Sequence, residues 1–365
     1  MRVLQIGADR SKRGILYSGT PAFKRQEAYA KQFGNLDIIG FSLRRDGAQF
    51  VDAGALRIFP TDSTSKLFWG FDTVRVARTL ARPDVVSVQD PFETGLVGWW
   101  IARKYKVPLH VQVHTDVLSP EYVRLSPLNR LRVLLAGFVL RRAAGIRVVS
   151  ERIKKSVQAH YGINVPITVL PIFVDVERIR NAERDPELMR RFTKWKTKLL
   201  IVSRLEPEKD VALAIRAFAR SAPADACLIV VGEGSEWPSL EDIAQECGIS
   251  KRVLFEGARD AAQYYPLVDL VLFPSRYEGY GMVIIEALVA GKPVLSTDVG
   301  IAREAGAIVT IEEKFAGALA EWFKSGPRTG TLNNYPYANF DEYVRAYCDD
   351  IASCVKAQKG HTTAI

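Results

Sequence analysis

Two glutamates and two glycines between residues 274 and 298 have the types and spacing needed to hold an anionic, hydroxyl-rich ligand. The segment PSRYEGYGMVIIEALVAGKPVLSTD follows the apolar run VDLVLF, and its turn EGYG opens into apolar-periodic residues 282–290. Glycine lets backbone approach a ligand, and a helix start offers N–H groups and a positive dipole end to an anion. The carboxylates of Glu278 and Glu286 can only accept hydrogen bonds, which suits hydroxyl groups. A phosphate between two sets of hydroxyls describes a sugar nucleotide.

The alternative is that both glutamates lie on a solvated loop and helix. This interpretation is the weaker one, because Glu286 lies within VIIEALVA, an otherwise apolar stretch in which an unpaired charge is costly.

A second group of charged residues follows the strand-like run LLIVSRL at 199–205. Arg204 and Lys209 lie five positions apart in the exit of this strand. A guanidinium forked onto one phosphate and an ammonium beside another would neutralise a diphosphate. The spacing alone is weak evidence, because such pairs also cap helices or pair on surfaces. The glutamate-bearing turn later in the same domain strengthens the prediction.

The E-x7-E pattern followed by GKPVLSTDVG resembles the donor-site signature of retaining glycosyltransferases of family four, which have the GT-B fold. The resemblance implies that Glu278 contacts the transferred sugar and that Glu286 binds the ribose. Arg204 and Lys209 match the family's R-x4-K element, whose cations hold the donor pyrophosphate. The further donor-binding residues implied are Gly232, Arg259, Gly279, Tyr280, Gly281, Met282 and Val283.

Polar residues also end two strands expected in the first half of the chain, PDVVSVQD and VPLHVQVHTD. His114 and Asp116 lie at the end of the second of these, and the loop 8–20 with Gly14 and Gly19 follows an earlier strand, RVLQIG. In an open parallel sheet such exits line a cleft. By resemblance, His114 contacts the donor sugar and the loop lies near the donor phosphates and the acceptor. The alternative for His114 is a structural histidine at a strand end.

The succession of strands and helices predicts an α/β protein with two Rossmann-like domains facing a cleft, the GT-B fold. We expect an N-terminal acceptor-binding domain at 1–185 and a nucleotide-sugar-binding domain at 196–335. The charge-rich segment near 180–196 is the expected boundary. Residues 336–365 contain an amphipathic helix that, by resemblance, returns to the first domain.

The net charge of +9 is unevenly distributed. Residues 1–195 contain 32 Lys plus Arg against 18 Asp plus Glu, a net +14, and the remainder has 18 against 23, a net −5. Basic residues surround apolar runs at 99–106 and 126–147, as in an interfacial helix at an anionic membrane. For any one segment, a buried helix with solvated basic ends is the favoured interpretation.

Several classes of protein are disfavoured by composition and motifs. No apolar run reaches the ~20 residues of a membrane span, and the start lacks a secretion signal, so we expect a cytoplasmic protein whose membrane contact is peripheral, at the inner face. Four scattered cysteines and the lack of an Asp-x-Asp pair give no metal site, and we expect no cofactor. Trp237 occupies the third glycine position of a dinucleotide fingerprint, and no nucleic-acid-binding module is visible.

These observations predict a retaining, metal-independent hexosyltransferase that uses a nucleotide diphosphate sugar. The favoured acceptor is a glycolipid or a polyprenyl-diphosphate-linked saccharide in cell-envelope glycan synthesis, and a soluble sugar or a protein is an alternative. Two other classes stay open. One is a non-catalytic nucleotide-sugar or nucleic-acid binding protein, and the other is a nucleotide-sugar hydrolase or epimerase with the same donor site.

Overall fold

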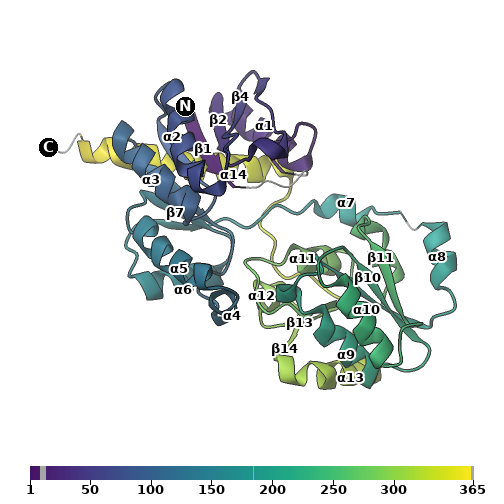
Figure 1. Cartoon of the computed structure of the whole chain (residues 1–365). Coiled ribbons are helices and arrows are strands. Elements are labelled where there is room, and N and C mark those ends of the chain that lie inside the picture. The colour runs from purple at the N-terminus through teal and green to yellow at the C-terminus, as the bar shows by residue number, and fades with distance from the viewer. Residues whose placement is uncertain (9–13, 184, 363–365) are drawn as a thin grey trace. The chain divides into compact units, whose positions relative to one another are not determined.

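The computed structural model describes residues 1–8, 14–183 and 185–362, and the chain forms two compact units (Figure 1). The first unit comprises residues 1–171 and the segment from Tyr337 onward, and the second comprises Ile172–Pro336. The expected end of the first domain at residue 185 therefore lies inside the second unit. Helix α7 (Val176–Arg180) contacts α11 (Met282–Val289), and Arg191 of α8 (Pro186–Phe192) pairs with Glu256 at 2.6 Å, so the charge-rich segment belongs to the second unit.

The first unit is built on an eight-stranded sheet in the order β3-β4-β2-β1-β5-β6-β7-β8. All neighbouring strands are parallel except β3 and β4. Short runs rich in Val, Ile and Leu form these strands because both faces of a parallel sheet are buried. The bounds are β1 Arg2–Gly7, β2 Asn35–Gly40, β3 Val51–Ala53, β4 Leu56–Pro60, β5 Val85–Val88, β6 Leu109–Val113, β7 Gly145–Val148 and β8 Ile167–Val169.

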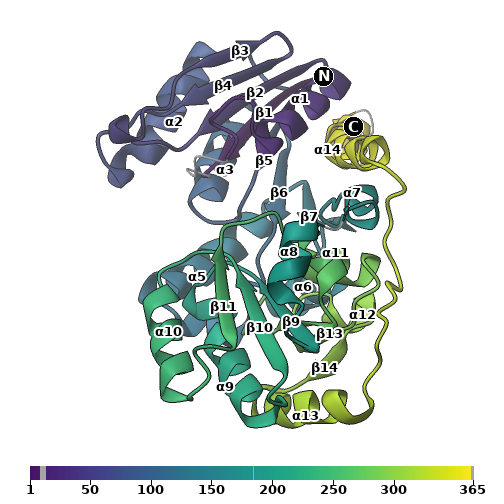
Figure 2. The ribbon, with the colours of Figure 1, turned by 90° about the vertical axis from the view of Figure 1, so that its right-hand side faces the viewer.

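Helices cover both faces of this sheet. Helix α1 (Pro21–Phe33) packs beside the final helix α14 (Phe340–Thr362), and Figure 2 shows this pair on the opposite side of β1 and β5 from α2 (Trp69–Thr79) and α3 (Glu93–Tyr105). The right-handed crossovers that follow β4, β5 and β6 place α2, α3 and α5 (Pro127–Leu140) on one face. The remaining helices are α4 (Pro120–Arg124) and α6 (Glu151–Tyr161).

Local sequence sets the helix starts. Thr20 and Ser126 each precede a proline, and their hydroxyl groups accept hydrogen bonds from Phe23 N and Asn129 N. An N-cap hydroxyl followed by proline at the first helical position is a strong start signal.

Helix α14 is part of the first unit through buried polar contacts. Tyr347 stacks on Tyr29 with ring centroids 4.1 Å apart. Asp350 Oδ2 lies 2.9 Å from His110 Nε2, and buried Arg147 donates to Tyr343 Oη at 3.3 Å. The helix therefore completes the core of the unit in which the chain begins.

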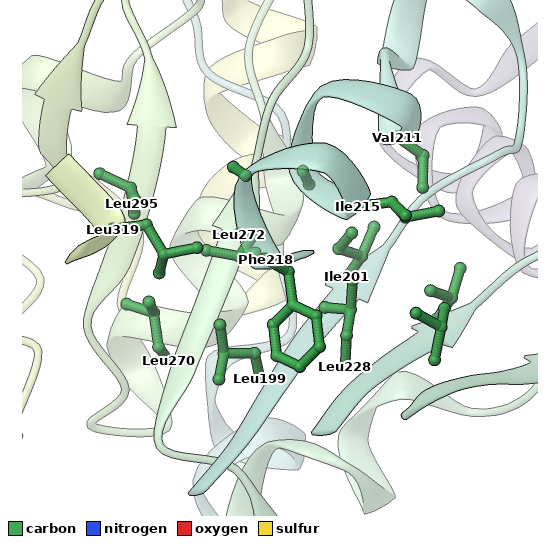
Figure 3. Packing of buried hydrophobic residues seen from close by; sticks show 14 of the residues in the cluster. Leu199, Ile201, Val211, Ile215, Phe218, Leu228, Leu270, Leu272, Leu295 and Leu319 are labelled. Atoms are coloured by element: carbon green, nitrogen blue, oxygen red, sulfur yellow. The ribbon is translucent and has the colours of Figure 1, made fainter. Parts of the chain in front are cut away.

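The second unit has a six-stranded parallel sheet in the order β11-β10-β9-β12-β13-β14. Its core lies between β9, β10 and β12 and the helices α9 (Val211–Ser221) and α13 (Phe315–Ser325), where Phe218 packs among leucine and isoleucine side chains (Figure 3). The other bounds are β9 Thr197–Val202, β10 Ala226–Val231, β11 Val253–Gly257, β12 Leu270–Phe273, β13 Val294–Thr297, β14 Ile308–Thr310, α10 Trp237–Glu246 and α12 Ala302–Ala305.

Both sheets have the strand order of a doubly wound fold, so the expected α/β architecture with two Rossmann-like units is confirmed. The direction of connection reverses between β1 and β5 in the first sheet and between β9 and β12 in the second. Such switch points, at the carboxyl ends of the strands, are where doubly wound folds bind ligands. Within the residues described, no helix combines the length and apolarity needed to cross a membrane.

Candidate functional site

The exits of β9 and β12, on the two sides of the second switch point, are joined by an ion pair. Lys209 Nζ lies 2.5 Å from Glu278 Oε1, and both side chains are mostly buried, with 14% and 16% of their surface exposed. Ser275 Oγ donates to the same carboxylate oxygen at 3.1 Å. The structure thus brings two of the predicted site residues together, and Ser275 is a partner that sequence reasoning missed.

The loop after β9 is held in place from the loop after β12. Asp210 caps α9, accepting from Leu213 N at 3.3 Å, and its other oxygen accepts from Arg276 Nε at 2.9 Å. Arg276 N also donates to Glu208 O at 2.9 Å. These bonds fix Lys209, which lies in the short turn between Glu208 and Asp210, beside Glu278.

Arg204 has a different environment from Lys209. Its guanidinium binds Glu208 Oε1 at 2.7 Å, and 69% of its side chain is exposed. The structure therefore shows the surface pairing that the R-x4-K spacing also allowed. The Glu208 side chain is only 15% exposed, so Arg204 is the member of the pair that can turn toward another anion in solvent.

The glycine-bearing turn forms the start of α11 as the sequence predicts. Gly281 is the N-cap residue with φ of 98°, and no side chain caps the helix. Gly279, Met282 and Val283 flank this cap, and Tyr280 is buried. The carbonyl of Tyr280 accepts from Ile301 N at 3.0 Å, and a Cβ on Gly300 would lie 2.2 Å from that oxygen. Gly300, in the DVG motif, therefore supports the turn, a role the sequence pattern did not reveal.

Glu286 is half-buried on α11 and is not a surface residue of the solvated helix considered above. Tyr265 donates to its Oε2 at 2.7 Å. Burial raises the pKa of Glu286, although the hydrogen bond from Tyr265 and the charge of Arg178 lower it. Arg178 itself pairs with Asp260. Tyr265, 21 positions earlier, is a second partner that no spacing rule indicates.

Gly232 ends β10 where the chain touches the exit of β9. With φ of 142°, it lies so close to Ser203 that an added Cβ would be 1.8 Å from the Ser203 carbonyl oxygen. Gly232 N donates to Gly257 O at 2.8 Å, which aligns the exits of β10 and β11. Arg259 follows this edge and is exposed. Among the described residues, buried Ser203 Oγ has no hydrogen-bond partner.

The remaining predicted residues belong to the first unit. His114 Nε2 lies 3.2 Å from Gln112 Oε1, and burial, aided by the charges of Arg147, His110 and Arg25, lowers its pKa to about 3. The imidazole is therefore neutral at physiological pH. Two residues on, burial raises the pKa of Asp116 against the opposing charge of Arg152.

The loop after β1 is described only in part, because residues 9–13 of the expected site loop lie outside the described residues. Thr20 Oγ1 donates to Gly14 O at 3.0 Å, and Gly19 has φ of 78° with open space where a Cβ would lie. Both glycines thus have a local role in the turn that precedes α1.

No group of three or more His, Cys, Asp or Glu side chains is placed to hold a metal ion in the part of the chain that the structure describes. The predicted cations at the exit of β9 are Lys209, mostly buried beside Glu278, and exposed Arg204. The arrangement can offer positive charge, an uncapped helix start and carboxylate acceptors along one sheet edge.

Two family models match the chain. The model described as "Glycosyl transferases group 1" matches residues 196–325, and "Glycosyltransferase Family 4" matches residues 28–178. Together they extend over most of both units.

Curated relatives include the alpha-monoglucosyldiacylglycerol synthase of Streptococcus pneumoniae, 27% identical over 65% of this chain and 58% of the relative. The 2-deoxystreptamine glucosyltransferase of Streptomyces kanamyceticus is 32% identical over 56% of each. The chain thus spans a little over half the length of the curated relatives it matches.

Two solved structures share the fold along the whole chain. HepE of Anabaena in complex with UDP and glucose has a TM-score of 0.69 at 20% identity, covering 100% of both chains. The sucrose-phosphate synthase of Thermosynechococcus elongatus has a TM-score of 0.73 at 16% identity, covering 100% of this chain and 98% of that one. At such identities the likeness shows the arrangement of helices and strands.

Proposed function

Because this chain belongs to the glycosyltransferases of family 4 and has their GT-B fold, we propose that it transfers a hexose from a nucleotide diphosphate sugar to an acceptor hydroxyl. The observation that carries the proposal is the Lys209–Glu278 pair at the switch point of the second sheet. In this pair an ammonium and a carboxylate lie side by side, close to an uncapped helix start. The complexes of HepE with UDP and with UDP-glucose support a donor of this class.

The donor is held by the second unit in this proposal. Glu278 and the backbone at 279–283 orient the hexose, and Glu286 accepts from the ribose hydroxyls. The diphosphate lies against Lys209 and Arg204, and the exposed guanidinium of Arg204 leaves Glu208 to bind it. Gly232 and Arg259 lie near the nucleoside.

The chemical step is proposed to proceed with retention and without a metal ion. The two cations stabilise the negative charge that develops on the departing diphosphate. Glu278 is poorly suited to attack the anomeric carbon, because Lys209 and Ser275 bind its carboxylate. We therefore favour a front-face route, in which the leaving phosphate oxygen takes the acceptor proton as the C–O bond to the acceptor forms. Neutral His114 donates or accepts one hydrogen bond to a sugar hydroxyl.

The acceptor is proposed to be a glycolipid or a polyprenyl-diphosphate-linked saccharide, bound by the first unit on the residues Asp116, Gly14 and Gly19. The basic charge of residues 1–195 and the lipid product named for the S. pneumoniae relative support a lipid-linked acceptor. The protein would then work in the cytoplasm, peripherally at the inner membrane face, in cell-envelope glycan synthesis.

Ligand-induced thermal shift tests the donor directly. A ligand bound only by the folded chain raises the melting temperature, and at a given concentration a tighter ligand raises it more. UDP, GDP, ADP and their hexose conjugates are compared with and without EDTA, and one diphosphate is expected to stabilise the chain in both conditions. Failure of every nucleotide would favour a different function, and stabilisation by RNA would favour the nucleic-acid-binding alternative.

Turnover tests the reaction. The stabilising donor is incubated with diacylglycerol or polyprenyl-phosphate acceptors in mixed micelles, and the product is identified by mass spectrometry. Arg204→Ala and Glu278→Ala are each expected to reduce transfer by orders of magnitude. Near-normal transfer by either variant contradicts its assignment. Free hexose or an epimerised donor without any acceptor would instead indicate the hydrolase or epimerase alternative.

A further inference from the structure

Large apolar side chains are exposed mainly on one face of the first unit. Of the fourteen large hydrophobic side chains exposed in the described structure, nine lie on or beside α2, α3, α4 and α5. They are Leu67, Phe68, Phe71, Leu96, Trp100, Leu125, Leu128, Leu131 and Leu134. We call this set, together with the lysines and arginines of the same helices, the α2–α5 face. Such a concentration is unusual for surface that meets only water.

The helices of the α2–α5 face are packed side by side. Trp99 of α3 meets Phe138 of α5 edge to face at 4.9 Å, and Arg132 of α5 binds Glu93 of α3 at 2.9 Å. A Cβ on Gly70 of α2 would lie 3.2 Å from Val97 of α3. The exposed apolar side chains therefore belong to one continuous layer.

The charge on these helices is almost entirely positive. Residues 66–82, 93–106 and 120–142 contain twelve Lys plus Arg and three acidic residues, Asp72, Glu93 and Glu121, for a net +9. Since the whole chain carries +9, all the other residues together carry no net charge. Each of the three acidic residues is paired with an arginine of the same layer. The excess basic charge of the protein is thus concentrated where its apolar side chains are exposed.

Several cations lie against aromatic rings of the same layer. Lys104 Nζ lies 5.5 Å from the ring of Trp100, and the Arg142 guanidinium lies 3.8 Å from that of Phe138. Long basic side chains that cover apolar rings can extend their charged ends toward headgroups while the rings enter the acyl boundary.

We propose that the α2–α5 face docks the protein on an anionic lipid surface, with α2, α3 and α5 lying along it. Two copies of the face would bring +9 against +9, which disfavours self-pairing. Single-stranded nucleic acid binds through aromatic platforms, whereas six of the nine exposed apolar side chains of the face are leucines. A lipid surface satisfies both properties of the face, because its headgroups bind the cations and its acyl chains accept the leucines.

The inference deepens the proposed function and rests on it in one respect, the lipid-linked acceptor. Helices α2, α3 and α5 follow parallel strands, so their first turns lie at the carboxyl edge of the first sheet. Leu67, Leu96 and Leu128 lie in or beside those turns. His114 and Asp116 leave β6 at the same edge. A membrane on this face would present an acceptor headgroup beside the proposed acceptor residues.

Vesicle flotation tests the surface without donor or turnover. The full chain is mixed with phosphatidylcholine vesicles, with or without about 30 mol% phosphatidylglycerol, at low and high salt. We expect binding to anionic vesicles at low salt that is at least about tenfold weaker without phosphatidylglycerol. The variant Leu67→Ser/Leu131→Ser/Leu134→Ser and the variant Arg103→Gln/Arg130→Gln are each expected to reduce binding about tenfold. The matched control is Ile311→Ser, which removes an equally apolar side chain, 53% exposed, from the second unit.

The possible outcomes distinguish a failure of the α2–α5 face from a failure of the proposed function. Wild-type indifference to lipid charge, or unchanged binding by both variants, overturns the α2–α5 face. A dimer in sedimentation velocity that the leucine variant abolishes, without vesicle binding, would show that the face pairs copies of the chain. Donor stabilisation measured by thermal shift should be unchanged in every variant. Loss of vesicle binding with donor stabilisation retained supports the face, whereas absence of any donor response counts against the proposed function alone.

Discussion

Lys209 and Glu278 come from loops 69 positions apart, and each satisfies the charge of the other in a mostly buried place. Removing one partner leaves the other as an uncompensated, desolvated charge, which is more damaging than removing both. Their individual effects on stability should therefore be strongly coupled.

We predict that Lys209→Met and Glu278→Gln each lower the melting temperature and reduce kcat about 10²–10³-fold, as loss of a transition-state donor typically does. The double variant should be more stable than the sum of the single losses implies and still inactive. Chemical denaturation and a transfer assay measure both quantities. The control is Lys251→Met, an exposed lysine of the same unit. Additive stability losses would contradict the pairing.

Glu286 gives a pH prediction with a definite sign. Because burial raises its pKa in the folded chain, the carboxyl stabilises the fold fully below its unfolded pKa of about 4.5. That contribution is lost as the pH rises through the raised folded pKa. Glu286→Gln retains an acceptor for Tyr265 and removes the titration.

We expect the melting temperature of Glu286→Gln to equal that of the wild type near pH 4 and to exceed it at pH 7. The same variant should bind the nucleotide more weakly, because a neutral amide is the poorer acceptor for a ribose diol. Calorimetric scans from pH 4 to 8 and nucleotide titrations provide the two measurements. A variant less stable than the wild type at pH 7 would show that the ionised carboxylate is stabilising.

At the scale of elements, the exits of β9 and β10 touch at Gly232. An added Cβ there would collide with the Ser203 carbonyl, and residues other than glycine rarely adopt the φ of 142°. Gly232→Ala is expected to destabilise the second unit by about 2–3 kcal/mol and to weaken nucleotide binding, because the exits of β9 and β10 must separate. Gly317→Ala is the matched control. It lies in α13 with open space around it, so alanine should stabilise by about 0.5–1 kcal/mol. Equal effects of the two substitutions, measured by urea denaturation, would be inconsistent with this contact.

The elements that present the site were predictable because each has a local signal. The apolar run before Pro274, the glycines of EGYG and the stop at Gly291 define β12 and α11 from sequence alone. Ser275, Tyr265 and Gly300 were missed because their contacts with the turn depend on tertiary packing. Arg204 was predicted beside the diphosphate, but the structure pairs it with Glu208 four positions away. Binding of a diphosphate would have to draw Arg204 away from Glu208.

At the scale of the whole molecule, the chain leaves the first unit at Pro171 and returns to it at Tyr337. The boundary predicted from the charge-rich segment lies after Pro171, inside the second unit. A polar helix such as α8 resembles a linker in sequence, because its partner Glu256 is 65 positions away. The return of α14 could be expected only by resemblance. Amphipathicity shows that a helix has a partner, and it does not show which sheet provides it.

The contacts of α14 lead to a prediction about the first unit alone. Asp350 Oδ2 accepts a hydrogen bond from Nε2 of buried His110, and although burial opposes it, this interaction lowers the pKa of Asp350. Asp350→Ala leaves the imidazole without this partner, and we expect a loss of about 1–3 kcal/mol. Because the pKa of Asp350 is depressed, the wild-type advantage should be present above pH 4 and fall as the solution is acidified through the folded pKa. Asp349→Ala, on the exposed side of the same turn, is the control.

Hydrogen exchange should show faster opening of β5, β6 and β7 in Asp350→Ala, with β9 to β13 unchanged. Uniform acceleration in both sheets would mean that α14 stabilises the chain as a single cooperative body.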